Sequence, residues 1–141
     1  MKYSIIFLII GISLIVAQEK RNPAINELIN SHVDGCGCYF KKNAKSEKYI
    51  IEINDGYSAW MNIDGEDVEL KYLKTVSSGI KFKVGAKYSQ FYSNEKYSIE
   101  IQYTITKVHP DSEEWTDMSA YIIIKRDNNI TKIKVVGGCG C

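Results

Sequence analysis

Apolar and polar residues alternate with period two over most of the chain from Cys36 onward. This alternation is typical of β-strands that bury one face and expose the other. The clearest case is 97–106, where Tyr97, Ile99 and Ile101 alternate with Ser98, Glu100 and Gln102. Further strands are predicted, from alternation or from a mostly apolar composition, at 36–40, 49–53, 57–63, 68–73, 80–88, 118–125 and 131–135.

Turn signals separate these stretches at regular intervals. Asp55-Gly56 and Asp64-Gly65 favour tight hairpins, and residues 77–79 and 127–129 have the composition of turns. Seven to nine short strands and no long helix predict an all-β fold. The pattern is compatible with an antiparallel sandwich and with a small barrel.

A short helix is predicted before the first strand. Asn22 suits the N-cap and Pro23 the first helical position, while Ile25, Leu28 and Ile29 form an apolar stripe. We interpret this stretch as a short N-terminal helix that covers one end of the β domain. The alternative is an amphipathic docking element.

The start of the chain is typical of a secretory signal peptide. Lys2 precedes an apolar run from Ile5 to Val16, and the small residue Ala17 precedes a charged stretch. We expect cleavage after Ala17, although an uncleaved N-terminal anchor is the alternative interpretation. The predicted organisation is therefore a signal peptide at 1–17, an N-terminal segment with the short helix at 18–35, and one β domain at 36–141. The mature protein is expected to be secreted or periplasmic, with no membrane span after cleavage.

The charge balance restricts the classes of partner. Removing residues 1–17 leaves 17 basic and 17 acidic residues. A neutral chain argues against a nucleic-acid-binding protein and against attraction to anionic membranes.

The four cysteines occur as two pairs near the ends of the mature chain. Cys36 and Cys38 would share a face if they lie in a strand, and so would Cys139 and Cys141. Antiparallel pairing of these strands predicts Cys36–Cys141 and Cys38–Cys139 disulfides, whereas parallel pairing predicts Cys36–Cys139 and Cys38–Cys141. The third connectivity closes each pair on itself in a small ring. An even number of cysteines in an exported chain favours disulfides.

A thiolate metal site is the alternative for the same four residues. Zinc and copper(I) both accept sets of cysteine sulfurs, but paired zinc ligands are usually two to four residues apart. Here one residue separates the cysteines of each pair. We therefore expect no metal and no cofactor, with Cys36, Cys38, Cys139 and Cys141 as the alternative metal ligands.

Two tryptophans are candidate binding residues. Trp60 either faces outward or serves as a core residue of its strand, because its parity is opposite to that of Ala59 and Met61. Trp115 follows Glu113 and Glu114 in an acidic loop, which could address a basic partner protein. In the alternative interpretation, the Trp115 ring folds back onto the sheet.

No arrangement of residues typical of catalysis is recognised. Neither His32 nor His109 belongs to a recognisable catalytic triad pattern. We therefore predict a small exported, disulfide-tied β domain that is not an enzyme and binds an extracytoplasmic protein, in the manner of an inhibitor or adaptor. A metal-binding protein that uses the cysteine pairs is the second hypothesis.

Overall fold

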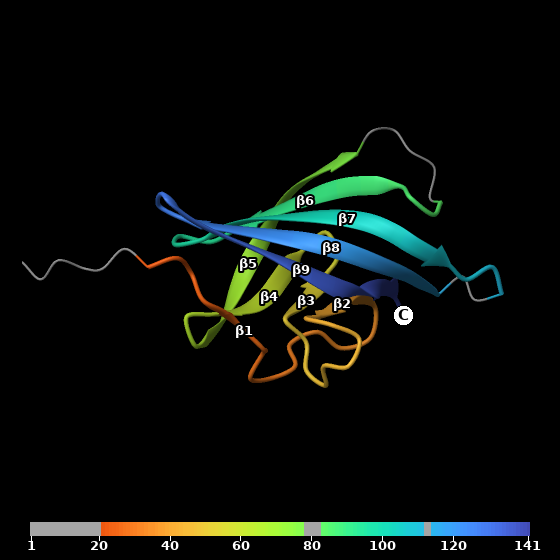
Figure 1. Ribbon diagram of the computed structural model, residues 1–141, viewed down its shortest axis with the longest axis horizontal. Helices are drawn as coiled ribbons and strands as arrows, with labels where there is room; N and C mark the ends of the chain where they lie inside the picture. Colours follow the sequence, from red (N-terminus) through yellow and green to blue (C-terminus); the bar gives the residue numbers. More distant parts are fainter. Residues whose placement is uncertain (1–20, 78–82, 112–113) are drawn as a thin grey trace, which may run out of the picture.

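The computed structural model describes residues 21–77, 83–111 and 114–141. The predicted signal peptide at 1–17 lies outside these residues. The chain forms nine strands (Figure 1): β1 (Ile25–Asn26), β2 (Gly37–Lys41), β3 (Ile51–Asn54), β4 (Ser58–Ile63), β5 (Glu66–Ser77), β6 (Lys87–Ser93), β7 (Ser98–Val108), β8 (Trp115–Arg126) and β9 (Asn129–Gly140).

Eight of these strands close into an antiparallel barrel. Each strand from β2 to β8 pairs with the strand that follows it in sequence, and β9 pairs back with β2. The short strand β1 is an addition, because it pairs with the end of β4 that extends beyond β3. The predicted all-β fold is confirmed, and of the two predicted architectures the chain adopts the barrel.

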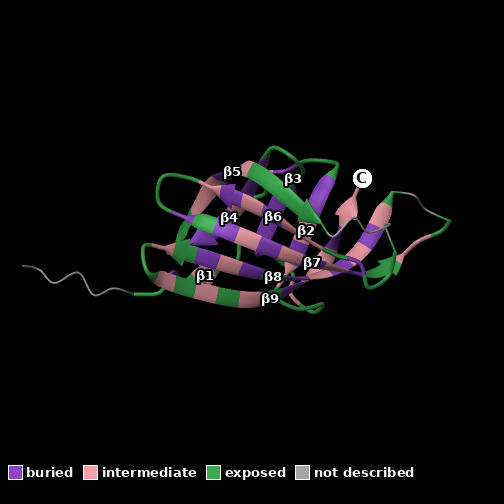
Figure 2. Cartoon of the chain, turned by 90° about the horizontal axis from the view of Figure 1, so that it is seen from above, coloured by how far each residue is buried: buried purple, intermediate pink, exposed green. Residues whose placement is uncertain are grey.

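Alternate side chains of the strands fill the barrel. Bands of buried and more exposed residues follow one another along the strands (Figure 2). An eight-stranded barrel has an interior just wide enough for side chains to fill. The largest fully buried side chains are Tyr92, Tyr103, Phe40, Ile51, Ile53, Met61, Ile63, Leu70, Ile99, Ile101, Ile105 and Ile122.

A buried polar cluster lies among these apolar residues. The Gln90 side-chain oxygen accepts hydrogen bonds from the hydroxyl groups of Tyr92 and Tyr103, at 3.0 and 2.9 Å. The Gln90 amide nitrogen donates to Asp55 in the β3–β4 turn at 2.8 Å. Gln90 is therefore satisfied on both sides, as a buried amide must be.

Two disulfides fasten the strands that close the barrel. Cys38 lies directly opposite Cys139 in the antiparallel β2–β9 pair. The bonds are Cys36–Cys141 and Cys38–Cys139, with Cα atoms 3.9 and 4.0 Å apart. These are the two bonds that antiparallel pairing predicts. Cys38 is buried, whereas Cys36 and Cys141 are exposed at the end of the barrel.

The prediction of a short N-terminal helix is not confirmed. Ile25 pairs with Ile63 and Asn26 with Asn62, so the stretch forms β1, and the described residues contain no helix. So few residues gain little from helix formation, since nucleation is unfavourable. The end of β4 offers backbone partners, and the fold buries Leu28, so the extended form is favoured.

The strand predicted at 80–88 is also misplaced. Residues 78–82 lie outside the described residues, and Gly85 has a positive φ of 86° within a turn. The strand β6 begins at Lys87, where the predicted one ends. In contrast, the hairpin predicted at Asp64-Gly65 is confirmed, because both residues have the positive φ values of a tight turn, 54° and 92°.

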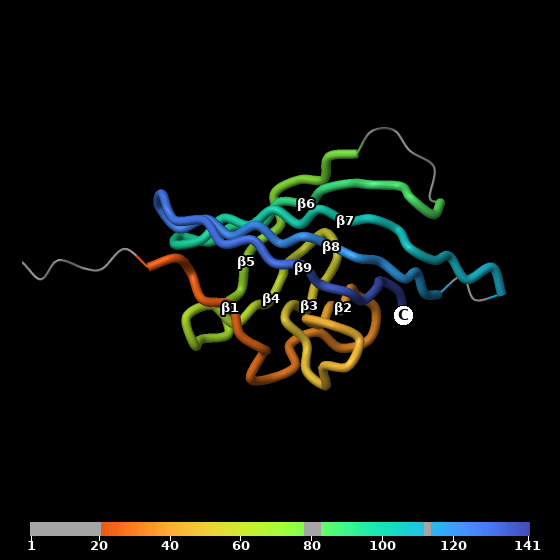
Figure 3. Tube along the Cα trace, in the orientation of Figure 1, coloured from red at the N-terminus to blue at the C-terminus, as the bar shows by residue number. Residues whose placement is uncertain are grey.

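The segment between β1 and β2 covers the outer surface of β3 and β4 (Figure 3). Glu52 of β3 is buried beneath it and accepts hydrogen bonds from the backbone N–H groups of His32 and Val33, at 2.7 and 2.9 Å. The described residues include no apolar helix of the length that crossing a bilayer requires.

Candidate functional site

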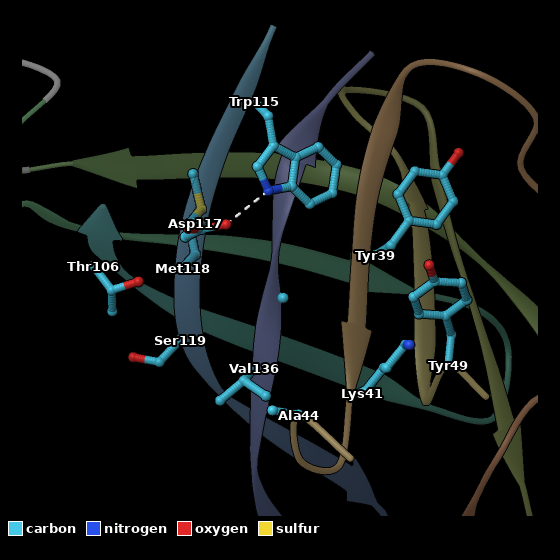
Figure 4. A pocket seen from close by; sticks show the side chains of 11 residues that line it. Tyr39, Lys41, Ala44, Tyr49, Thr106, Trp115, Asp117, Met118, Ser119 and Val136 are labelled. Atoms are coloured by element: carbon cyan, nitrogen blue, oxygen red, sulfur yellow. Dashed lines mark hydrogen bonds between the residues drawn. The ribbon is translucent and has the colours of Figure 1, made fainter. Parts of the chain in front are cut away.

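A groove on the outer face of the barrel follows the seam where β2, β9 and β8 meet (Figure 4). Its volume is about 370 Å³, within the usual range for small-molecule sites. Aromatic side chains form parts of both walls. The lining residues are Tyr39, Lys41, Ala44, Tyr49, Thr106, Trp115, Asp117, Met118, Ser119, Val136 and Gly137.

Glycines of β9 make the groove possible. A Cβ atom on Gly137 would lie 1.9 Å from the Tyr39 carbonyl oxygen, so only glycine allows β9 this approach to β2. A Cβ atom on Gly138 would lie 2.7 Å from the ring of Trp115. The indole therefore packs directly against the backbone of β9 at Gly138. Any other residue at position 138 would displace the indole.

Hydrogen bonds hold the Trp115 wall in place. The Trp115 indole N–H donates to Oδ1 of Asp117 at 2.8 Å, and Nε2 of His109 lies 3.0 Å from Oδ2 of the same carboxylate. Partial desolvation acts to raise the pKa of Asp117. The hydrogen bonds from His109 and Trp115 outweigh this effect and lower the pKa below its usual value. Asp117 is therefore a carboxylate at neutral pH, with both oxygens engaged.

The opposite wall consists of two tyrosines and a lysine. Tyr39 and Tyr49 have ring centroids 5.4 Å apart, and the Tyr39 hydroxyl donates to the Gly35 carbonyl oxygen at 2.8 Å. Burial, and then the charges of nearby Glu52 and Asp34, raise the pKa of Tyr39. Lys41 places its ammonium group 5.2 Å from the centroid of the Tyr49 ring. The hydrogen bond to Gly35 therefore fixes the Tyr39 side chain in this wall, and Lys41 places a positive charge at the edge of the wall.

The groove is suited to binding an apolar or aromatic group. Preformed aromatic walls around a small concave surface can bury one large apolar side chain. In the described part of the chain, both histidine rings bond to carboxylates, His32 to Asp67 and His109 to Asp117. Neither ring hydrogen-bonds to a hydroxyl or thiol group there, so neither histidine is placed to activate such a group among these residues.

Of the predicted binding residues that the structure describes, Trp115 lines the groove, whereas Glu114 and Trp60 do not. Glu113 lies outside the described residues. Glu114 is exposed near the disulfides, and its carbonyl oxygen accepts a hydrogen bond from the Cys141 N–H at 2.8 Å. The acidic loop next to Trp115 therefore contributes no described acidic side chain to the groove, apart from Asp117 at the start of β8.

Trp60 lies on a different part of the outer surface. Its ring stacks on His32 with centroids 4.0 Å apart and planes 6° apart. His32 in turn bonds to Asp67 at 2.8 Å. Trp60 is therefore on the outer face of β4, but the segment before β2 covers it, so neither predicted alternative describes its surroundings fully.

The four cysteines do not form a thiolate site. No free cysteine remains in the described residues, because all four sulfurs are in disulfides. The described residues also contain no cluster of three or more histidine, cysteine or acidic side chains placed to hold a metal ion. The metal-binding hypothesis for these cysteines fails because a disulfide sulfur is not a thiolate.

Sequence reasoning missed most of the groove. Tyr39 and Lys41 come from β2, and Tyr49 comes from the loop before β3. Asp117 comes from β8, so only the closure of the barrel brings it next to them. One signal was present in the sequence. Gly137-Gly138 lies between the strand predicted at 131–135 and the last cysteine pair, and glycines in an extended stretch indicate a close approach by another group.

Comparison of the chain with protein-family models, with functionally characterised proteins and with solved structures finds no match. A functional assignment therefore depends on the geometry and chemistry of the groove at Trp115.

Proposed function

We propose that this protein is an exported binding protein that captures an extracytoplasmic protein at the groove lined by Trp115. The observation that carries the proposal is an open, preformed groove with Trp115 on one wall and Tyr39 and Tyr49 on the other. Tryptophan and tyrosine are enriched among the residues that dominate binding energy at protein interfaces. The interior of the barrel is filled by side chains, so the outer groove is the favoured place for a ligand.

Export is supported by the sequence and is compatible with the disulfides. The N-terminal stretch ending at Ala17 is typical of a signal peptide. Two disulfides suit a protein that works in an oxidising compartment, where such bonds persist.

The test compares capture of partners from the exported protein fraction by three forms of the chain. Trp115→Ala removes the indole from the groove and should abolish capture of the partner that the wild type retains. Tyr121→Ala is the matched control, because Tyr121 is an exposed aromatic residue of β8 that does not line the groove. It should retain capture.

Thermal unfolding of each variant separates binding from folding. The Trp115 ring is partly exposed, so its removal should leave the melting temperature within a few degrees of the wild type. Undiminished capture by a folded Trp115→Ala protein would show that the groove is not the contact surface.

A further inference from the structure

The two charged residues of the groove differ in how they are paired. Both carboxylate oxygens of Asp117 are engaged, one by Trp115 and one by His109. Lys41, on the opposite wall, has no carboxylate within ion-pair distance among the residues that the structure describes. Its ammonium group lies 5.2 Å from the centroid of the Tyr49 ring. Within the described ranges, Lys41 is therefore a charge on the groove wall without a carboxylate counterion.

More lysines surround the same end of the groove. Lys42, Lys45 and Lys48 are exposed on the loop from β2 to β3, which also contributes Ala44 to the wall. Lys134 is exposed on β9, two residues before the lining residue Val136, and is likewise without an ion pair in the described part of the chain. Glu47 is the acidic residue of the loop, so its lysines outnumber its acids by three to one.

We propose that the groove binds an acidic segment of the partner protein. An apolar or aromatic side chain of that segment enters between Trp115 and the two tyrosines, and its flanking carboxylates meet Lys41 and the lysines of the β2–β3 loop. The inference rests on the proposed function, since it names the chemistry of the partner at the same groove. A buried apolar anchor supplies affinity, whereas complementary charges at the rim supply specificity and a faster encounter.

A basic partner segment is the competing outcome. The sequence suggested one because Glu113 and Glu114 precede Trp115. However, Glu114 does not line the groove, and Asp117 is already engaged by two internal donors. The unpaired charge on the walls belongs to Lys41, so the described groove favours an anionic segment.

The test uses three synthetic peptides with blocked ends and a central phenylalanine. The flanking residues are glutamates in the first peptide, serines in the second and lysines in the third. Binding is followed by NMR through the indole N–H signal of Trp115, which a Trp115→Phe variant distinguishes from that of Trp60. We expect the glutamate peptide to bind about tenfold more tightly than the lysine peptide at low ionic strength, and to weaken as salt is added.

Charge reversal on the protein completes the test. Lys41→Glu combined with Lys45→Glu should weaken binding of the glutamate peptide about tenfold more than it weakens binding of the serine peptide. Lys87→Glu combined with Lys125→Glu is the matched control, because it changes the net charge equally and neither residue lines the groove. This control should leave the affinity for the glutamate peptide at the wild-type value.

The outcomes separate the two proposals. Equal or tighter binding of the lysine peptide, or indifference of the glutamate peptide to the Lys41 and Lys45 reversals, would overturn the inference and leave the groove as the contact. If no peptide shifts the Trp115 signal, the groove itself is overturned as the contact surface.

Discussion

The carboxylate of Asp67 holds the segment before β2 against the barrel, together with that of Glu52. The Asp67 carboxylate accepts hydrogen bonds from the backbone N–H groups of Ile29 and Asn30, both at 3.0 Å, and from the Asn62 side chain at 2.9 Å. Nε2 of His32 lies 2.8 Å away. Burial acts to raise the pKa of Asp67, but these hydrogen bonds outweigh it and bring the pKa well below the usual 3.8.

This pKa shift makes the stability of the fold depend on pH. A lowered pKa in the folded state means that the carboxylate stabilises the fold above pH 3.8, and that this contribution disappears as the pH falls toward the folded-state pKa. We expect Asp67→Asn to reduce the free energy of unfolding by about 2 kcal/mol at pH 7. Below about pH 4 the difference from the wild type should shrink.

Urea unfolding of both proteins between pH 2 and pH 7 measures this difference. Glu66→Gln is the control, because Glu66 is the exposed acid next to Asp67 and should change stability little. A difference that stays constant over the whole pH range would contradict the role given to Asp67.

At the residue scale the sequence identified Trp115 but not its surroundings. An aromatic residue in a polar loop is visible as a candidate in sequence. Tyr39 faces Trp115 across the β2–β9 seam, but in the sequence most of the barrel strands lie between the two residues. Trp60 shows the opposite problem, because its parity correctly allowed an outward orientation, but only the tertiary structure shows that His32 covers its ring.

At the scale of elements, β9 is the strand on which the groove depends. Gly137 approaches the backbone of β2 so closely that an added Cβ atom would lie 1.9 Å from the Tyr39 carbonyl oxygen. Since the contact is with backbone and not with a flexible side chain, one of the two strands would have to shift.

Gly137→Ala should therefore reduce the free energy of unfolding by about 3 kcal/mol or more. Val136→Ala removes a partly exposed side chain from the neighbouring position and should cost only about 1 kcal/mol. Chemical denaturation of the two variants gives the comparison. Equal losses for both would mean that the close β2–β9 approach has been misjudged.

The strands were largely predictable because the barrel leaves one face of each strand buried. The period-two pattern of 97–106 corresponds to β7, and the Asp64-Gly65 turn joins β4 to β5 as predicted. The errors lie where pattern and tertiary structure disagree. Ile25, Leu28 and Ile29 have a helical apolar spacing, but residues 25–26 pair with the end of β4 that extends beyond β3. The alternation before Lys87 continues through the turn at Gly85.

At the scale of the whole molecule, the two disulfides unite the chain ends and the groove. Cys38 immediately precedes Tyr39 of one wall, and Gly140 pairs with Trp115 of the other wall. The bonds span 105 and 101 residues of sequence, yet they lie next to each other in the β2–β9 pair. They therefore act on the same seam and should not contribute independently to stability.

Removal of the disulfides should be non-additive. Once either bond is present, the other closes only a few residues, so loss of one pair through serine substitution should cost about 2 kcal/mol. Loss of both should cost about 6–7 kcal/mol in the chain-entropy model, because the long loop is then open as well. Denaturant unfolding of the two double variants and the quadruple variant measures this. If the loss of stability in the quadruple variant equalled the sum of the losses in the two double variants, the two disulfides would not constrain the same strand pair.

The β2–β9 seam both closes the barrel and builds the groove. One measurement tests it directly: alkylation of the folded, unreduced Cys36→Ser variant, followed by mass-spectrometric fragmentation of its C-terminal peptide. Cys36→Ser should free one thiol, and the label should be on Cys141, with Cys139 still bonded to Cys38. A label on Cys139 would indicate parallel pairing, one on Cys38 would indicate that each pair closes on itself, and either result would contradict the antiparallel seam.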